Sequence, residues 1–284
     1  MTTTHSCRCF IAGNLLFISL LVSFSAIFSC RAQTLKVITY AYPDIDRANA
    51  VSPIAMWLEK KHAAVVEIDV LKTLDDLRLR ISQGDYSVAL PNLTGYLLVI
   101  SETQTVPILV PNQHPTASGY SSSIIGLHVP ALDEWSQQGS LKAYAVWPNS
   151  ASGGLIGRSW LKQNITKHYA RIDFTFVGSH AKVAEHVSQD EGAIGILASQ
   201  EFLKHTPPLK ELWRSPQIPF GPLLCNPEQL DCATLTEDIL KDKDGMRLIL
   251  KGLQTGWSEF SESTELVSPV ISTYQSLAEV ISSP

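Results

Sequence analysis

The residues best suited to chemistry lie between Trp147 and Leu161. Here Ser150, Ala151, Ser152, Gly153 and Gly154 join an apolar run to a helix-like segment that begins near Leu155. The first turn of a helix carries unpaired N–H groups, its dipole favours negative charge, and small residues let an oxyanion approach closely. The stretch therefore predicts an anion-binding site, although the same pattern is also typical of an ordinary N-cap followed by a flexible turn.

Motifs for catalysis are missing from the sequence. Residues 153–159 look at first like a phosphate-binding P-loop, but only three residues separate Gly153 from Gly157, and arginine stands where lysine is needed. Neither serine of the loop has the GxSxG context of a nucleophile, and the chain has no HExxH or paired-carboxylate motif. The histidines show no metal-ligand spacing. We therefore expect a binding protein without cofactor or metal rather than an enzyme.

Two runs of alternating strands and helices must position this loop. In the first run, strands are expected at residues 35–40, 65–71 and 86–90, with helices at 50–62 and from Thr73 to Gly84. In the second run, strands are expected at 143–147, 172–177 and 193–197, with helices at about 155–168 and 181–189. This alternation predicts an α/β fold built on mostly parallel sheets that are covered on both faces.

The chain passes between these runs in two places. Residues 120–126 and 213–222 look like paired crossings between two lobes, and the chain after Thr234 reads as helical. We therefore expect lobe one to comprise residues 33–121 and 223–284, and lobe two to comprise residues 122–222.

The first 32 residues resemble an export signal. Arg8 precedes an almost uninterrupted apolar run from Phe10 to Phe28, and cleavage after Ala32 would fit a small-x-small site. Two alternatives stay open, which are a lipoprotein anchored at Cys30 and a retained membrane anchor. We expect the protein in the periplasm.

Charge and cysteine content fit an exported protein. Without residues 1–32 the chain has 20 basic and 27 acidic residues, a net charge of −7, which argues against a nucleic-acid partner. Only Cys225 and Cys232 then remain of the five cysteines, and such a pair in an exported protein favours a disulfide. A metal site at these cysteines is less favoured because the nearest histidine, His205, is twenty residues from Cys225.

Four segments of the chain carry a family resemblance: residues 86–96, 148–153, 178–180 and 213–219. In this order they resemble motifs of the periplasmic phosphonate and phosphate-type solute-binding proteins of ABC transporters. The resemblance covers nearly all of the chain after the signal. It implies the two-lobed type II periplasmic-binding-protein fold, a membrane permease as partner and a monomeric chain.

The resemblance also implies a cleft that closes on a small tetrahedral oxyanion of the phosphonate, phosphate or phosphite class. Neutral donors in a dry cleft can hold such an ion without a full countercharge, and a protonated His180 would strengthen binding at mildly acid pH. Each implied residue also has a purely structural alternative, as a helix cap, a turn residue or a packed aromatic ring. The implied ligand-binding residues are Tyr42, Asn92, Tyr120, Ser150, Ala151, Ser152, Gly153 and His180.

Two positions depart from the family pattern. Ala151 stands where the family commonly has threonine, and Ala193 stands where an aspartate would fall. The second change removes an acidic partner for an aminoalkyl group, which argues against aminoethylphosphonate as the ligand. It also leaves an alternative function open, namely a ligand-sensing or interaction module of the same fold with a retuned cleft, serving a membrane receptor kinase.

Overall fold

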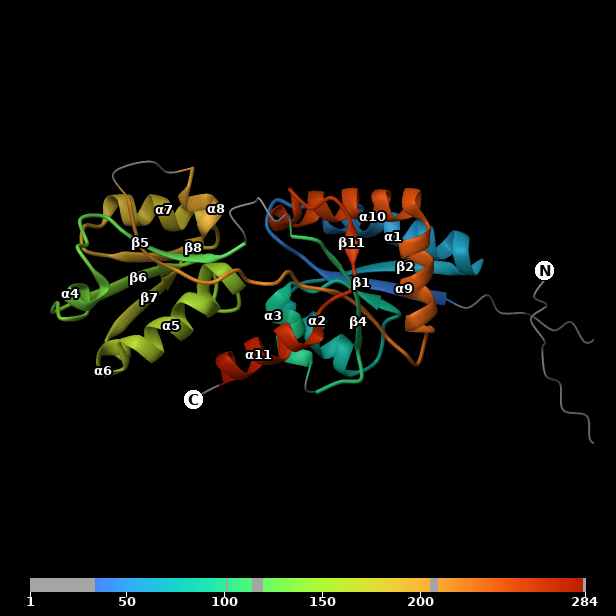
Figure 1. The fold of residues 1–284 in the computed structure, drawn as a ribbon, viewed down its shortest axis with the longest axis horizontal. Coiled ribbons are helices and arrows are strands. Elements are labelled where there is room, and N and C mark those ends of the chain that lie inside the picture. The colour runs from blue at the N-terminus through green and yellow to red at the C-terminus, as the bar shows by residue number, and fades with distance from the viewer. Residues whose placement is uncertain (1–33, 101, 114–119, 205–208, 283–284) are drawn as a thin grey trace, which may run out of the picture. The chain divides into compact units, whose positions relative to one another are not determined.

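The structure is a computed structural model that describes residues 34–100, 102–113, 120–204 and 209–282 (Figure 1). The expected signal peptide, residues 1–32, and the alternative lipid attachment at Cys30 lie outside the described residues. Within the described ranges, no helix is both long and apolar enough to cross a membrane.

The first sheet has six strands in the order β11-β4-β10-β3-β1-β2. Strand β1 runs parallel to β2 and β3, whereas β10 runs antiparallel to both β3 and β4, and β11 runs antiparallel to β4. The strands are β1 (Thr34–Tyr40), β2 (Val65–Leu71), β3 (Val88–Ala89), β4 (Val106–Pro111), β10 (Leu223–Cys225) and β11 (Leu266–Val267).

The second sheet has five strands in the order β7-β6-β8-β5-β9. Strand β6 runs parallel to β7 and β8, and β5 runs antiparallel to β8 and β9. The strands are β5 (Ser122–Gly126), β6 (Leu141–Ala145), β7 (Ile172–Phe176), β8 (Ile194–Ala198) and β9 (Lys210–Arg214).

The expected α/β fold with two helix-flanked sheets is confirmed, but the sheets are mixed rather than mostly parallel. The difference comes from the segments expected to be simple crossings. Residues 122–126 form β5, and β9 ends inside the second crossing, so one strand enters the second sheet beside another that leaves it. Two such neighbouring strands must run in opposite directions. Their pairing continues past the sheet, where the N–H of Ile218 donates to the carbonyl oxygen of Tyr120 at 2.7 Å.

Helices cover both faces of the first sheet (Figure 1). Alternate residues of β1 point to opposite faces, so Leu35 and Val37 enter one hydrophobic core and Ile38 and Tyr40 enter another. The first core contains residues of α1 (Arg47–His62), α9 (Cys232–Lys241) and α10 (Lys243–Gly256). The second contains residues of α2 (Leu74–Ser82), α3 (Leu93–Val99) and α11 (Ile271–Ser282).

The second sheet is covered in the same way. Ile124 of β5 packs in a core with Trp135 and Leu161, while its neighbour Ile125 packs in a separate core with Val183 and Val187. The helices on the first face are α4 (Leu132–Ser136), α5 (Ile156–Asn164) and α6 (Thr166–Tyr169), and those on the second are α7 (His180–Gln189) and α8 (Ser199–Phe202).

Helix starts follow the capping residues. A capping box begins α2, with Thr73 and Asp76 each accepting from the backbone N–H of the other. Helix α1 begins at Arg47, before the expected start at Ala50, because the side chain of Asp46 accepts the N–H of Asn49 at 3.0 Å. This earlier start places Arg47 in the first turn of α1.

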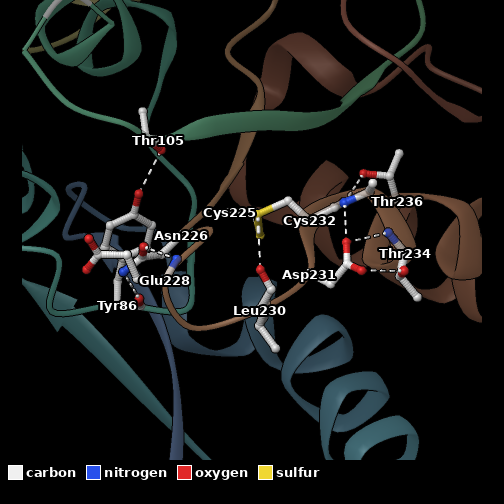
Figure 2. The surroundings of a disulfide bond; sticks show 11 residues. Tyr86, Thr105, Cys225, Asn226, Glu228, Leu230, Asp231, Cys232, Thr234 and Thr236 are labelled. Atoms are coloured by element: carbon white, nitrogen blue, oxygen red, sulfur yellow. Dashed lines mark hydrogen bonds between the residues drawn. A yellow bond between two sulfur atoms is a disulfide. The ribbon is translucent and has the colours of Figure 1, made fainter.

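A disulfide joins the end of β10 to the start of α9 (Figure 2). It connects Cys225 and Cys232, whose Cα atoms lie 5.8 Å apart, and both residues are buried. Asp231, directly before Cys232, caps α9 by accepting the backbone N–H groups of Ala233 and Thr234. The bond and the cap together fix the loop that leads from the first sheet into its last helices.

Candidate functional site

The serine-glycine loop forms a five-residue π-helical turn, η1 (Ala151–Leu155), in front of α5. Ser150 caps this turn, because its hydroxyl accepts the N–H of Gly153 at 3.2 Å. Val146 donates its N–H to the carbonyl oxygen of Gly153 at 2.7 Å, and the Ser122 hydroxyl donates to the carbonyl oxygen of Ser152 at 2.6 Å. The loop is therefore held to its own sheet by hydrogen bonds.

The two glycines of the loop are required by close packing. A Cβ atom on Gly153 would lie 2.3 Å from Cγ2 of Val146 and 2.8 Å from Cε1 of His180. On Gly154 it would lie 2.1 Å from the carbonyl oxygen of Trp147. The absent side chains thus bring the loop against β6 and against the imidazole of His180.

His180 is the first residue of α7, whose N-cap is Ser179. Its Nδ1 accepts the backbone N–H of Ala198 at 3.0 Å, which leaves Nε2 as the protonated nitrogen of the neutral ring. Burial lowers the pKa of His180 to about 4, with Glu201 opposing this shift and Lys204 reinforcing it. Desolvation disfavours the charged form, which argues against the expectation that His180 becomes a cation at mildly acid pH.

Six of the eight implied ligand residues meet at one small cavity of about 80 Å³, which has lining residues from both sheets. They are Tyr42, Asn92, Tyr120, Ser150, Ala151 and His180. A volume of this size accommodates a few water molecules or a small ion. The structure thus brings most of the expected residues together, and their roles in binding stay a prediction.

Ser152 and Gly153 do not line this cavity. The Ser152 side chain is fully buried, and its hydroxyl has no hydrogen-bond partner among the described residues. Ser152 lies close to the Tyr120 phenol. Burial raises the pKa of this phenol, and interactions with the hydroxyl and backbone of Ser152 partly oppose the shift. The structure therefore does not bring the Ser152 hydroxyl to the cavity surface, because the turn directs it into the protein.

Asn92 and Tyr42 reach the cavity from the first sheet. The Oδ1 atom of Asn92 caps α3 by accepting the N–H of Gly95 at 2.8 Å, so the amide nitrogen is the group that remains to donate to a ligand. Burial and the nearby Glu259 raise the pKa of Tyr42, and Arg47 lowers it. Tyr42 therefore stays a neutral phenol at physiological pH.

Arg47, which no sequence motif indicated as a ligand residue, also lines the cavity. Arg47 is only 4% exposed, and its guanidinium carbon lies 3.7 Å from the ring centroid of Trp257 and 4.9 Å from that of Tyr40. The Nε and Nη1 atoms of Arg47 have no hydrogen-bond partner among the described residues, and neither has Nε1 of Trp257. Burial lowers the pKa of Arg47, whereas Tyr40 and Glu259 raise it.

Glu259 is the second charged residue on the cavity surface that sequence analysis missed. It lies in the short 3-10 helix η2 (Ser258–Phe260) that follows α10. Burial raises the pKa of its carboxyl group, and Arg47 opposes this shift. Ala193, the position where the family pattern would place an acidic residue, is 1% exposed and does not line the cavity. An acidic group is thus present, but it comes from η2, which follows α10 beside the first sheet.

Two larger hollows adjoin the cavity. One of about 600 Å³ shares Tyr120, His180 and Glu259 with it, and one of about 360 Å³ shares Tyr42 and Ser150 with it. The small cavity is therefore the constricted part of a longer cleft. Among the described residues, no group of histidine, cysteine, aspartate and glutamate side chains could hold a metal ion.

Two helix-flanked α/β sheets beside a donor-lined cavity fit the class of two-lobed solute-binding proteins. The chain belongs to the family described as "ABC transporter, phosphonate, periplasmic substrate-binding protein", which it matches over residues 39–265. Members of this family bind substrates for transporters, so the protein is not an enzyme. Membership in a periplasmic family also implies an extracytoplasmic location.

Solved structures support the fold at low sequence identity. XAC2383 from Xanthomonas citri, bound to chloride ion, is 12% identical, with a TM-score of 0.67 over 87% of this chain and 97% of that chain. PhnD1 from Prochlorococcus marinus, in complex with methylphosphonate, is 14% identical, with a TM-score of 0.63 over 87% and 96%. A phosphonate-transporter binding protein from Pseudomonas aeruginosa, PA3383, is 15% identical, with a TM-score of 0.59 over 88% and 85%. A comparison with curated protein sequences finds no significant match.

Proposed function

We propose that this protein captures a small tetrahedral oxyanion of the phosphonate, phosphate or phosphite class and delivers it to an ABC transporter. The observation that carries the proposal is the cavity of about 80 Å³, where donor groups from both sheets meet in a chain that belongs to this family. Hydrogen bonds to an ionised acceptor are shorter and stronger than neutral ones, so a cavity of donors favours an anion.

The chemistry of the lining residues supports an oxyanion over other ligands. Nε2 of neutral His180, the Ser150 hydroxyl and the amide nitrogen of Asn92 are all available to donate. The cavity volume supports a compact ion such as phosphate or methylphosphonate over a nucleotide or a sugar phosphate. Nothing in the matched family or in the described residues favours the sensing alternative.

The proposal includes export of the chain. Residues 1–32 would act as the signal peptide, and residues 33–121 with 223–284 and residues 122–222 would form the two lobes that close on the ligand. The Cys225–Cys232 disulfide supports an oxidising compartment, and the periplasm provides one. Mass spectrometry of protein isolated from the periplasm without reductant should find these two cysteines joined. Two free thiols would argue against this location.

The test is a thermal-shift and calorimetry screen of the mature chain with phosphate, phosphite, methylphosphonate, sulfate and acetate. A ligand that binds only the folded protein stabilises it by about 2.7 kcal/mol at a concentration one hundred times Kd. We expect at least one tetrahedral phosphorus oxyanion to raise Tm with saturation and acetate to leave it unchanged.

Two results would contradict the proposal. A flat response to all five ions would remove the oxyanion function. Equal Tm shifts for all five at equal ionic strength would show a general salt effect rather than a site, because screening by salt does not saturate with a defined stoichiometry.

A further inference from the structure

The side chain of Arg47 has unused hydrogen-bonding capacity at the cavity. It is more than nine-tenths buried, it lines the cavity, and its Nε and Nη1 atoms have no partner among the described residues. The same holds for Nε1 of Trp257, which is 2% exposed and lines the same cavity. Buried polar groups are nearly always hydrogen-bonded, so three orphan donors at one cavity require an explanation.

Stability alone does not explain this arrangement. Burying a charge costs free energy, and the hydrogen bond with Tyr40, the nearby Glu259 and the cation–π contacts offset only part of that cost, because the pKa of Arg47 is still lowered. The ring centroids of Tyr40, Tyr42 and Trp257 lie 3.7 to 5.5 Å from the guanidinium carbon, and none of these rings accepts a hydrogen bond from Nε or Nη1. The rings therefore hold Arg47 in place and leave its donors available.

Resting on the proposed function, we propose that Arg47 is the charge partner of the bound oxyanion, with Nε1–H of Trp257 as an accompanying donor. The two residues form a subsite on the first-sheet side of the cavity, opposite Ser150 and His180. A guanidinium group offers two parallel N–H donors that match two oxygens of one phosphorus or sulfur centre. The site thus contains a full positive charge and not only the neutral donors of the serine-glycine loop.

Glu259 does not occupy these donors. No hydrogen bond or ion pair joins it to Arg47 among the described residues, although the two groups are close enough to influence each other's pKa. Glu259 therefore limits the positive potential of the subsite without saturating its N–H groups. The ligand class that fits is a compact oxyanion with acceptor oxygens on two sides, one side facing the loop and the other facing Arg47.

The experiment compares Arg47→Met and Arg47→Lys with the wild-type mature chain by calorimetry, using the phosphorus oxyanion that the wild type binds best. Methionine keeps much of the apolar contact with the rings, and lysine keeps the charge without the planar fork. The matched control is Arg158→Met, because Arg158 also stacks on aromatic rings, those of Phe174 and Phe176, but does not line the cavity.

We expect Arg47→Met to lower the affinity for the oxyanion by at least about 100-fold, which is the effect of truncating one partner of a buried charge pair. Arg47→Lys should lose less, and Arg158→Met should bind as the wild type does. The Tm of ligand-free Arg47→Met should equal or exceed that of wild type, which shows that the loss is not unfolding.

Three results would overturn the inference. If the wild type binds and Arg47→Met binds within about threefold of it, Arg47 is not the charge partner, while the proposed function stands. If Arg158→Met weakens binding as much as Arg47→Met, the effect is one of net charge. If the wild type binds none of the oxyanions, the proposed function fails and the subsite fails with it.

Discussion

The two walls of the cavity provide hydrogen-bond donors of different kinds. The second-sheet wall, consisting of Ser150, Ala151 and His180, is neutral and held by backbone hydrogen bonds. The first-sheet wall, consisting of Tyr40, Tyr42, Arg47, Trp257 and Glu259, contains two ionisable groups of opposite sign held by aromatic contacts and burial. One wall therefore presents fixed dipoles, and the other presents charges whose pKa values are shifted.

This difference has a physical consequence for the empty protein. The neutral wall satisfies most of its own hydrogen bonds, because the loop carbonyls accept from Val146 and Ser122 and the imidazole accepts from Ala198. The charged wall leaves donors of Arg47 and Trp257 unsatisfied. Ligand binding should therefore stabilise the first-sheet wall more than the second, since the buried donors that lack a partner lie on that wall.

The largest effect that tests the neutral wall is the pH dependence contributed by His180. Its pKa is lowered to about 4, below the ordinary value of 6.5, so the folded state binds the proton later than the unfolded state as pH falls. The stabilising contribution is full above pH 6.5 and is lost as pH falls toward 4. When the pH falls from 6.5 to 4, the free energy of unfolding should therefore decrease by about 3 kcal/mol less in His180→Gln than in the wild type.

Urea unfolding at a series of pH values measures this difference. The control is His62→Gln, because His62 is an exposed residue at the end of α1. If the free energy of unfolding depends on pH in the same way in the wild type and in His180→Gln, His180 does not need to be neutral in the folded protein.

A smaller effect separates the two serines of the loop. Ser150 lines the cavity and caps η1, whereas the Ser152 hydroxyl is buried without a partner. Ser150→Ala should weaken oxyanion binding by about 2 kcal/mol, the value of a hydrogen bond to a charged group. Ser152→Ala should leave the affinity unchanged, because Ser152 does not line the cavity.

Calorimetry with methylphosphonate and phosphate measures both variants under one set of conditions. Ser152→Ala serves as the matched control for Ser150→Ala, since both remove one hydroxyl from the same turn. A loss of affinity in Ser152→Ala equal to that in Ser150→Ala would mean that the turn rearranges on binding and that the two walls are less distinct than described.

The smallest effect concerns the acid on the charged wall. Glu259→Gln removes a negative charge from the cavity and should tighten binding of methylphosphonate at pH 7.5 by about 1 kcal/mol, or roughly fivefold. Burial raises the pKa of Glu259, so the wild-type carboxylate is neutralised at a higher pH than an ordinary carboxyl group. The difference between variant and wild type should therefore shrink as pH falls.

Glu262→Gln is the control, because Glu262 is exposed and lines the adjoining larger hollow but not the cavity. Weaker binding of methylphosphonate by Glu259→Gln would contradict the expected repulsion. It would indicate that the carboxyl group of Glu259 donates a proton to the ligand or orients Arg47.

The sequence predicted the neutral wall because its signals are local. Ser150 as a cap and two glycines at a strand-to-helix junction are adjacent in the chain, and the structure has that cap and that close packing. The strand expected at residues 65–71 has the same bounds in the structure, because its run of β-branched residues is long enough to indicate a strand. Strands β10 and β11, of three and two residues, are too short to show a period and were missed, and the six-residue strand β4 was missed as well.

The charged wall could not be predicted in the same way. Arg47 and Glu259 are far apart in the sequence, and their meeting depends on how α1 packs against α10 and on the turn that follows α10. An arginine in sequence normally indicates a solvated surface, and its burial follows from tertiary packing. The one local signal was Asp46, whose capping role fixes Arg47 in the first turn of α1.

The hydrogen bond between Ile218 and Tyr120 links the two passages of chain that connect the sheets. Any bending between the sheets must deform both passages together, and the phenol of Tyr120 lies in the wall of the cavity at that same point. Under the proposed function, Tyr120 would therefore both join the two passages and contact the ligand. A ligand bound there would restrain this connection directly, without a relay through either hydrophobic core, and the Tyr120 ring is a position for a spectroscopic probe of that restraint.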